Sequence, residues 1–311
     1  MGQTMRAARL YAVDKPFVVE ELPVPEPRPT DVLVRVRACG VVPNLRNIIL
    51  NWNKWLPHLP TPPLPAIYGL DAAGEIAAVG SQVHGFKPGD RVYVNPGHAC
   101  GSCRHCRDGN VMNCRSYTFR GYFGFGPGSR DIFADYPYGG FSEYLTAPTY
   151  SLVHLPAAVS YEAAARFGYI GTAYAGILKA DVGGGSTILI DGISGTLGLG
   201  ACLVALALGI PRILGTGRNQ ALLDRVKAIA PDRIEVKALG GRSVTDWALG
   251  QTDGDGVDAV IECVGPNTPA ATVLDAFGAI RRGGRAVNIS GAAEPKLRVA
   301  RPSLYSTIGR R

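Results

Sequence analysis

The stretch STILIDGISGTLGLGACLVALALGIPRILGTGRN, residues 186–219, decides how the second half of the chain folds. It opens with an apolar run that ends at Asp191 and is followed by three glycines at intervals of three residues. An alanine-rich apolar segment over 197–208 comes next, and a second apolar run then ends in Gly-Thr-Gly-Arg-Asn. This order predicts a strand, a glycine turn, a helix and a second strand.

The glycine turn contains Gly192, Gly195 and Gly198. Glycines at this point let the turn tighten, and they let a pyrophosphate approach the backbone N–H groups at the positive end of the next helix. The spacing is Gly-x-x-Gly-x-x-Gly and not the commoner Gly-x-Gly-x-x-Gly, so the motif alone also fits a turn that binds no nucleotide. The pattern around the turn favours the nucleotide.

The rest of the second half alternates between helical and strand patterns. A segment over 160–180 begins with Ser160 as a helix N-cap and has small and aromatic residues at helical spacing. The further expected elements are helix 220–230, strand 233–238, helix 243–249, strand 257–263, helix 268–281 and strand 285–290. Such alternation predicts a parallel sheet, which binds its ligands beyond the carboxyl ends of its strands.

The first half shows the alternation of apolar and polar residues that half-buried strands have. The expected strands lie within residues 6–22, 31–38, 66–79, 90–94 and 141–147. Turns rich in glycine and proline separate them. Many short strands with such turns predict a β-rich, barrel-like first domain.

Four cysteines, Cys100, Cys103, Cys106 and Cys114, share one short loop. Four thiolates this close in sequence can surround one tetrahedral Zn²⁺ and leave no open position, which describes a structural site. A ferredoxin-type cluster would have three residues before the fourth cysteine and a proline after it, whereas this chain has seven residues and then Arg115. Two disulfides or a zinc ribbon for nucleic acid fit this spacing less well.

The composition excludes several classes of protein. A chain of 311 residues with 46% hydrophobic residues has room for two globular domains, and no apolar stretch reaches the length of a membrane span. The N-terminus lacks the apolar core of a signal peptide, and the seven cysteines suit reduced thiols, so we expect a cytoplasmic protein. Five of the seven net positive charges follow Glu294, so the basic balance does not predict nucleic-acid binding.

In this order the motifs resemble the medium-chain dehydrogenase/reductase superfamily, the relatives of zinc alcohol dehydrogenase. The matching stretches are GLDAAG at 69–74, GFKPGDRV at 85–92, the cysteine loop, GGFSEY at 139–144, residues 162–176, the glycine turn and DGVDAVIECVG at 255–265. The resemblance implies an α/β protein with substrate in the cleft between its domains. The implied parts are a GroES-like β-rich catalytic domain at 1–156, a Rossmann doubly wound parallel sheet at 157–291 and an atypical basic tail at 292–311.

The chain departs from this family at the catalytic zinc. Relatives hold that zinc with the cysteine of a Gly-Val-Cys stretch, the histidine of a Gly-His-Glu stretch and a third cysteine before the Rossmann domain. The matching positions here are Val42, Leu70 and Tyr169. Valine and leucine cannot bind a metal, and a lone phenol is a poor zinc ligand, so we expect no catalytic zinc. The alternative is an unusual site that combines Asp71 with His58 or His84.

Loss of the zinc removes the Lewis acid that polarises a carbonyl group. Hydride transfer can still proceed when the acceptor is a quinone or conjugated enone, or when a side chain protonates the product oxygen. Val-Pro-Asn at 42–44 resembles the zinc-free quinone and enone reductases of the superfamily, which places Asn44 and Tyr169 near the nicotinamide. Tyr169 is then a proton donor or oxyanion partner, or simply a packed aromatic residue, and Asp71 is the third catalytic candidate.

The end of the second Rossmann strand favours NADP(H). An NAD site has an acidic residue there for the ribose hydroxyl, whereas this chain has Arg218 as a cationic partner for a 2′-phosphate. Thr216 and Asn219 are expected to add hydrogen bonds. The full set of expected cofactor-binding residues is Thr172, Gly192, Ser194, Gly195, Thr196, Leu197, Gly198, Thr216, Gly217, Arg218, Asn219, Val264, Gly265 and Ser290.

The motifs end at about residue 291, before a strand that relatives use as a dimer interface, so we expect a truncated C-terminus and an uncertain oligomeric state. The sequence therefore predicts an NADP(H)-dependent oxidoreductase with one structural zinc that acts on a small carbonyl, enone or quinone. Its alternatives are an alcohol dehydrogenase for simple alcohols and ketones, and an inactive cofactor-binding fragment.

Overall fold

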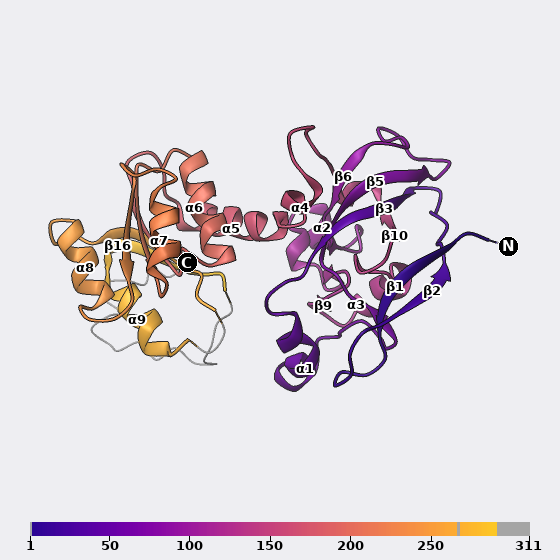
Figure 1. Ribbon diagram of the computed structural model, residues 1–311, viewed down its shortest axis with the longest axis horizontal. Coiled ribbons are helices and arrows are strands. Elements are labelled where there is room, and N and C mark those ends of the chain that lie inside the picture. The colour runs from indigo at the N-terminus through magenta and orange to yellow at the C-terminus, as the bar shows by residue number, and fades with distance from the viewer. Residues whose placement is uncertain (1, 266–267, 291–311) are drawn as a thin grey trace. The chain divides into compact units, whose positions relative to one another are not determined.

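The computed structural model describes residues 2–265 and 268–290, and the predicted basic tail at 292–311 lies outside this part. The described residues form two compact units, which divide after Gly168 (Figure 1). The division follows Gly168 and not residue 156, where the sequence places it. The reason is that helix α4 (Tyr161–Ala164) contacts strands of the first unit, and the ring of Phe167 packs against that of Tyr93 with centroids 5.5 Å apart.

The first unit is built from small antiparallel sheets, as the alternating pattern predicts. Its main sheet has five strands in the order β10-β3-β5-β6-β11. These strands are β3 (Asp31–Gly40), β5 (Asp71–Val79), β6 (Arg91–Val94), β10 (Tyr144–Pro148) and β11 (Leu152–His154). A second sheet joins β1 (Thr4–Leu10) to β2 (Val18–Pro23) and β4 (Ala66–Ile67).

One predicted strand, 66–79, is interrupted between β4 and β5. Gly69 lies at the break with a φ of 115°, a conformation that side chains with a Cβ atom rarely adopt. A Cβ atom there would also lie 2.5 Å from the backbone nitrogen of Phe141. The alternating pattern does not reveal such a kink, because Tyr68 before it and Asp71 after it are both buried.

Three helices and a third small sheet of the first unit are absent from the sequence prediction. The helices are α1 (Leu45–Trp55), α2 (Arg104–Arg107) and α3 (Ser129–Asp135), and two 3₁₀ turns lie at Val111–Asn113 and Thr149–Ser151. The sheet joins β7 (Gly97–His98), β8 (Thr118–Phe119) and β9 (Phe123–Gly124). Helix α1 packs on this sheet by stacking Trp52 on Phe123, with ring centroids 4.0 Å apart.

The second unit is the predicted parallel sheet, with strand order β14-β13-β12-β15-β16. The strands are β12 (Thr187–Asp191), β13 (Arg212–Gly217), β14 (Ile234–Ala238), β15 (Val257–Glu262) and β16 (Ile280–Asn288). The order reverses direction at β12, so β12 and β15 flank the topological switch point, where sheets of this kind bind ligands.

Helices cover both faces of this sheet. They are α5 (Phe167–Ala180), α6 (Thr196–Ala207), α7 (Gln220–Lys227), α8 (Val244–Gln251) and α9 (Ala270–Gly278). On one face Ile188 and Ile190 pack with residues of α5, α6 and α7, and on the other Leu189 packs with residues of α8 and α9. The sheet is thus covered on both sides, which explains the continuous apolar runs of its strands.

The helix predicted over 160–180 is divided into α4 and α5. Ser160 caps α4 as predicted, because its hydroxyl accepts the N–H of Ala163 at 3.1 Å. The chain is tightly packed at the start of α5, since a Cβ atom on Gly168 would overlap the carboxylate of Asp71. Helical periodicity alone cannot show this packing constraint.

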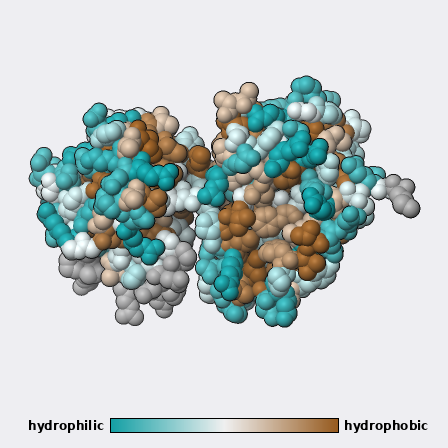
Figure 2. All heavy atoms as spheres, in the orientation of Figure 1, coloured by the Kyte–Doolittle hydropathy of each residue, from teal (hydrophilic) through white to brown (hydrophobic). Residues whose placement is uncertain are grey.

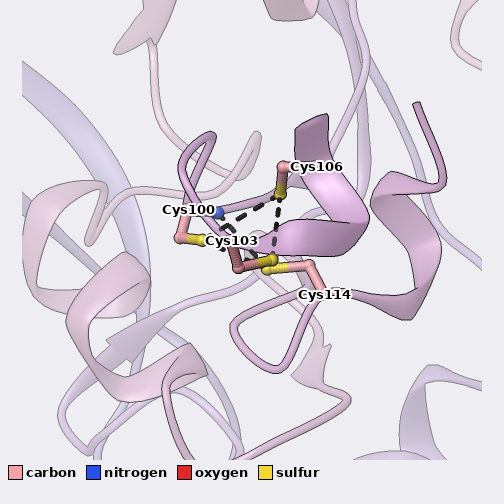
Figure 3. A group of neighbouring side chains, drawn as sticks. All are labelled: Cys100, Cys103, Cys106 and Cys114. Carbon is pink, nitrogen blue, oxygen red and sulfur yellow. Dashed lines mark hydrogen bonds between the residues drawn. The ribbon is translucent and has the colours of Figure 1, made fainter. Parts of the chain in front are cut away.

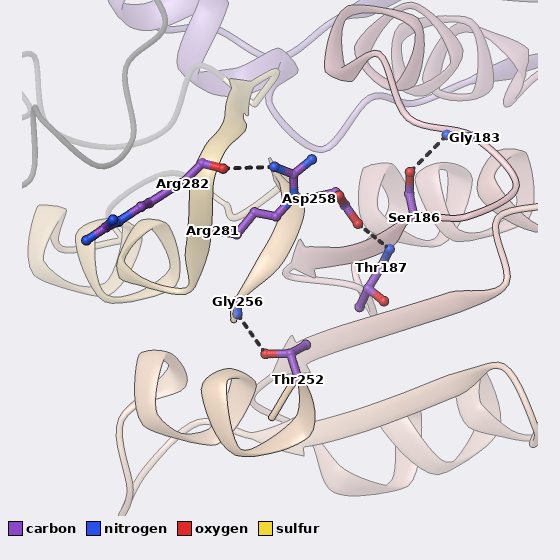
Figure 4. Close-up of polar contacts among 8 residues, drawn as sticks. All are labelled: Gly183, Ser186, Thr187, Thr252, Gly256, Asp258, Arg281 and Arg282. Atoms are coloured by element: carbon purple, nitrogen blue, oxygen red, sulfur yellow. Dashed lines mark hydrogen bonds and ion pairs between the residues drawn. The ribbon is translucent and has the colours of Figure 1, made fainter. Parts of the chain in front are cut away.

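The amino ends of the central strands are tied together by polar contacts (Figure 4). The carboxylate of Asp258 accepts the N–H of Thr187 at 2.7 Å and the guanidinium of Arg281 at 2.7 Å. The hydroxyl of Thr252 accepts the N–H of Gly256 at 3.0 Å. These contacts occupy this end of the sheet and leave the carboxyl end for a ligand.

Hydrophobic and hydrophilic residues are mixed on the face shown in Figure 2. The exposed large hydrophobic residues include Val19, Val41, Trp55 and Leu178. None of the helices in the described part of the chain is long and apolar enough to cross a membrane.

We expect Gly198→Ala to destabilise the second unit by about 1–3 kcal/mol, because its Cβ atom would overlap the carbonyl oxygen of Gly192. Gly184→Ala is the control, since nothing lies within 4 Å of its Cβ position. Denaturant unfolding of the cofactor-free protein measures both changes. Equal stability of the two variants would contradict the tight contact between the turn and α6.

Candidate functional site

The four loop cysteines converge on one point, as Figure 3 shows. Their sulfur atoms all lie within 4.8 Å of one another, with Cys100 to Cys106 at 3.9 Å, Cys103 to Cys106 at 3.6 Å and Cys114 to Cys100 at 3.6 Å. A tetrahedral ion with Zn–S bonds of about 2.3 Å requires sulfur atoms roughly 3.8 Å apart. The three short separations match those of a four-thiolate zinc site.

Backbone N–H groups donate hydrogen bonds to the sulfur atoms, which stabilises negatively charged thiolates. The N–H of Ser116 donates to the sulfur of Cys114 at 3.3 Å, and the N–H of Cys100 donates to the same atom at 3.5 Å. N–H groups of Ser102 and Cys103 lower the pKa of the Cys100 thiol to about 6. Desolvation and the neighbouring thiols raise the pKa of Cys106 to about 12. A divalent cation would relieve this crowding, because it stabilises all four thiolates.

The predicted dinucleotide turn lies between β12 and α6. Gly192 has a φ of 86°, and the carbonyl of Gly192 lies against Gly198, so the turn closes tightly on the first turn of the helix. Gly195 is the N-cap of α6 and is exposed, and Thr196 and Leu197 begin the helix. The backbone N–H groups at the start of this helix are the expected anion donors.

Strand β13 makes room for this turn. A Cβ atom on Gly215 would lie 2.5 Å from the side chain of Ile193, and one on Gly217 would lie 2.7 Å from the hydroxyl of Ser194. The two glycines of Gly-Thr-Gly thus accommodate the side chains of the turn. This packing requires both glycines, and the cofactor contact expected of Gly217 stays a prediction.

Thr216 differs from its predicted role. Its side chain is fully buried, and its hydroxyl donates to the carboxylate of Asp191 and accepts the N–H of Gly192 at 3.2 Å. Its carbonyl oxygen accepts the N–H of Ile193 at 2.8 Å. Thr216 therefore stabilises the glycine turn. Its hydroxyl proton is donated to Asp191 and is not available for a hydrogen bond to a 2′-phosphate.

Arg218 and Asn219 follow this strand and are both exposed. The side-chain oxygen of Asn219 accepts the N–H of Leu222 at 3.2 Å, so it caps α7, which the sequence prediction missed. Arg218 makes no hydrogen bond or ion pair with the rest of the described chain. Its guanidinium is therefore free to bind an anion near the end of β13.

Other predicted cofactor residues lie at the carboxyl end of β15 and on α5. Val264 is buried and Gly265 is exposed directly after it, with no atom within 4 Å of its Cβ position. The hydroxyl of Ser290 lies 2.9 and 2.8 Å from the two carboxylate oxygens of Glu262. Thr172 is exposed on α5. The structure thus brings the residues of β12, β13 and β15 to one edge of the sheet.

The three catalytic candidates lie on different elements. Asp71 is 1% exposed, and its carboxylate accepts the Tyr93 hydroxyl at 2.7 Å and the N–H of Gly168. Burial raises the pKa of Asp71, and these two donors oppose the rise. Asn44 lies at the N-cap position of α1 without a side-chain hydrogen bond to the helix backbone, and its side-chain oxygen accepts the side-chain amide of Asn47 at 3.0 Å. Tyr169 belongs to α5.

The positions that hold catalytic zinc in relatives carry Val42, which is buried, Leu70, which is half-buried, and Tyr169. Within residues 2–265 and 268–290, the structure gathers three or more possible metal ligands only at the four cysteines. Asp71 belongs to no such group with His58 or His84 in these residues.

Sequence reasoning missed two polar partners. Tyr93 holds Asp71, although it lies in the middle of a predicted strand with no motif around it. Glu262 faces Asp191 across β12 and β15 because the two residues are partners in the parallel register. A count of residues from the start of each predicted strand could have suggested this second pair.

The chain is similar to known dehydrogenases along most of its length. Residues 28–157 match the alcohol dehydrogenase GroES-like domain, and residues 196–306 match the zinc-binding dehydrogenase family, past residue 291, where the motifs end. L-threonine 3-dehydrogenase of Escherichia coli K12 is 30% identical over 284 residues, which are 90% of this chain and 76% of that protein.

Two solved structures extend this similarity. The NADP-bound structure of a protein assigned as a zinc-binding dehydrogenase from Sinorhizobium meliloti 1021 has a TM-score of 0.80 at 25% identity, and covers 97% of this chain and 81% of its own. An NAD-dependent alcohol dehydrogenase has a TM-score of 0.79 at 27% identity, with 97% and 82% covered. This chain belongs to the zinc alcohol dehydrogenase-like branch of the medium-chain dehydrogenase/reductase superfamily, whose members are oxidoreductases.

Proposed function

We propose that the chain is an NADP(H)-dependent oxidoreductase that transfers hydride to or from a small carbonyl compound, enone or quinone without a catalytic zinc. The observation that carries this proposal is the chemistry of the replaced ligand positions. Val42 and Leu70 offer no donor atom, and Asp71 beside them is already bound to Tyr93 and Gly168. A substrate that needs no Lewis acid suits such a centre.

Bound NADP(H) would supply or accept the hydride. The chain's own part is then to hold the substrate and to move a proton at its oxygen atom. The phenol of Tyr169 is the group we propose for this proton, with the Asn44 amide as a second polar partner. Asp71 is better suited to positioning, because it holds the N–H of Gly168 directly before Tyr169 in the chain.

The choice of NADP(H) rests on Arg218. Residues 215–219 contain no acidic side chain, and the guanidinium of Arg218 is exposed and unpaired within the described chain. Similar structures include both an NADP-bound and an NAD-dependent protein, so the choice comes from this residue. A 2′-phosphate carries charge that matches an arginine fork.

A second candidate activity is oxidation of a secondary alcohol. It is favoured by the relative named L-threonine 3-dehydrogenase and by the intact four-cysteine loop. Steady-state assays with NADPH on enones, quinones and simple ketones, and with NADP⁺ on secondary alcohols and L-threonine, separate the two. Preferred turnover of enones or quinones supports the zinc-free mechanism, and turnover of alcohols alone contradicts it. Cofactor binding without any turnover indicates a binding protein.

We expect one zinc ion per chain, held by Cys100, Cys103, Cys106 and Cys114. Chelation should speed tryptic cleavage within 95–116, where Arg104, Arg107 and Arg115 lie, and leave the circular dichroism of the sheets intact. Atomic absorption and timed proteolysis measure the two effects, with Cys202→Ser as the control because this thiol lies in the core of the other unit. Two zinc ions per chain would show that a catalytic zinc exists.

Arg218→Ala should weaken NADPH binding about 10–100-fold and leave NADH binding unchanged, because only the phosphorylated ribose loses a charged partner. Arg225→Ala removes the same charge from an exposed position on α7 and is the control. Fluorescence titration with both cofactors gives the dissociation constants. Equal weakening for NADPH and NADH would rule out the contact with the 2′-phosphate.

Tyr169→Phe should lower kcat by about 100-fold without changing the NADPH dissociation constant, because the variant loses only the proton donor. Tyr174→Phe is the matched control on the same helix, where the ring is 47% exposed. Turnover at saturating substrate measures both. Unchanged kcat would make Tyr169 a packing residue.

A further inference from the structure

Three polar side chains lie side by side at the carboxyl edge of the parallel sheet. Asp191 is the last residue of β12 and Glu262 the last residue of β15, and the two are partners in the register. Thr216 is the second-to-last residue of β13, on the other side of β12. All three are 0% exposed. Two carboxyl groups are therefore buried together at the switch point of the sheet, directly under the glycine turn.

The two acids differ in how they are satisfied. Glu262 accepts the N–H of Val264 at 2.8 Å, and the Ser290 hydroxyl lies within hydrogen-bond distance of both its oxygens. Asp191 accepts the Thr216 hydroxyl through Oδ1, whereas its Oδ2 has no partner in the described chain. The ionised form of Asp191 is thus a buried charge with one uncompensated oxygen, which is costly.

The groups that face Asp191 add to this cost. Glu262 is the last residue of β15, Cys263 follows it directly and Asp275 lies on α9, while β13 contributes the neutral Thr216. Burial, followed by the charges of Glu262 and Asp275, raises the pKa of Asp191 to about 6. The group therefore titrates near neutral pH, where an ordinary aspartate would be fully ionised.

Asp191 is coupled to the turn through one side chain. Its carboxylate holds the Thr216 hydroxyl, which in turn accepts the N–H of Gly192, the first glycine of the turn. A change in the charge of Asp191 therefore acts on the turn both through this contact and through its electric field.

We propose that Asp191 makes the affinity for NADP(H) depend on pH: its neutral form permits tight binding at the turn, and its ionised form weakens it. The inference rests on the proposed function, because it requires the dinucleotide phosphates to bind over residues 192–198. A phosphate there brings negative charge toward a buried carboxylate, and such a pair interacts strongly where water is excluded. Protonation of Asp191 removes the repulsion.

The test compares the wild-type chain with Asp191→Asn by NADPH fluorescence titration from pH 5 to pH 8. We expect equal affinity near pH 5 and about tenfold tighter binding by the variant at pH 8. The measured quantity is the wild-type dissociation constant divided by that of the variant. The ratio is used because the 2′-phosphate of NADPH also titrates in this range and affects both proteins alike. Asp232→Asn, which removes an exposed carboxylate of the same unit, should give a ratio of one throughout.

A second readout uses no cofactor. Because the folded-state pKa of Asp191 is raised, its ionisation lowers stability as pH rises from about 4 through 6, and the cost persists above 6. The midpoint of thermal unfolding of Asp191→Asn should therefore exceed that of the wild type at pH 7 and match it near pH 4. If the asparagine variant does not fold, Asp191→Ser replaces it, since its hydroxyl still accepts from Thr216.

The outcomes separate the inference from the proposed function. The inference is supported if the ratio of the wild-type to the variant dissociation constant rises with pH. Tight NADPH binding with a ratio that does not change with pH overturns the inference and leaves the function standing. Failure of the wild type to bind NADPH or NADH at any pH overturns both.

Discussion

The second unit depends on the close approach of the carbonyl of Gly192 to Gly198, which only a glycine permits. This contact lies in the turn between the end of β12 and the first residues of α6. The hydroxyl of Thr216 stabilises the turn by donating to Asp191 and accepting the N–H of Gly192. Gly215 and Gly217 leave room for Ile193 and Ser194. Everything proposed about the cofactor follows from a turn held in this way.

The first unit contains a cluster of four thiols and, elsewhere, positions at which relatives hold a catalytic zinc. Four thiols, supported by backbone donors, are arranged for a metal that stabilises the loop. At the positions of the catalytic zinc, apolar side chains have replaced the ligands, and the remaining carboxylate of Asp71 is used by Tyr93 and Gly168. A family named for zinc thus contains a chain whose zinc chemistry we propose to be structural.

Most of the fold follows from local patterns. Alternating apolar residues predict the strands of the first unit, and continuous apolar runs predict those of the second. The order of helices and strands after residue 186 predicts a parallel sheet, which the structure confirms. The helices α1, α2 and α3 were missed, and α1 shows one reason, because its Trp52 packs on Phe123, which is distant in sequence. The division after Gly168 was missed for the same reason.

The sequence by itself determined the family, the four thiols, the missing zinc ligands and the glycine turn, since each depends on residue type and spacing along one segment. Only the tertiary structure decided what the polar side chains of that turn do. Thr216 and Asn219 were expected to face the cofactor, yet Thr216 is bound to Asp191 and Asn219 caps α7. Asp191 and Glu262 become neighbours only when β12 and β15 pair. The burial and the hydrogen-bond partners of these side chains depend on strands that are far apart in sequence, so no local sequence pattern predicts them.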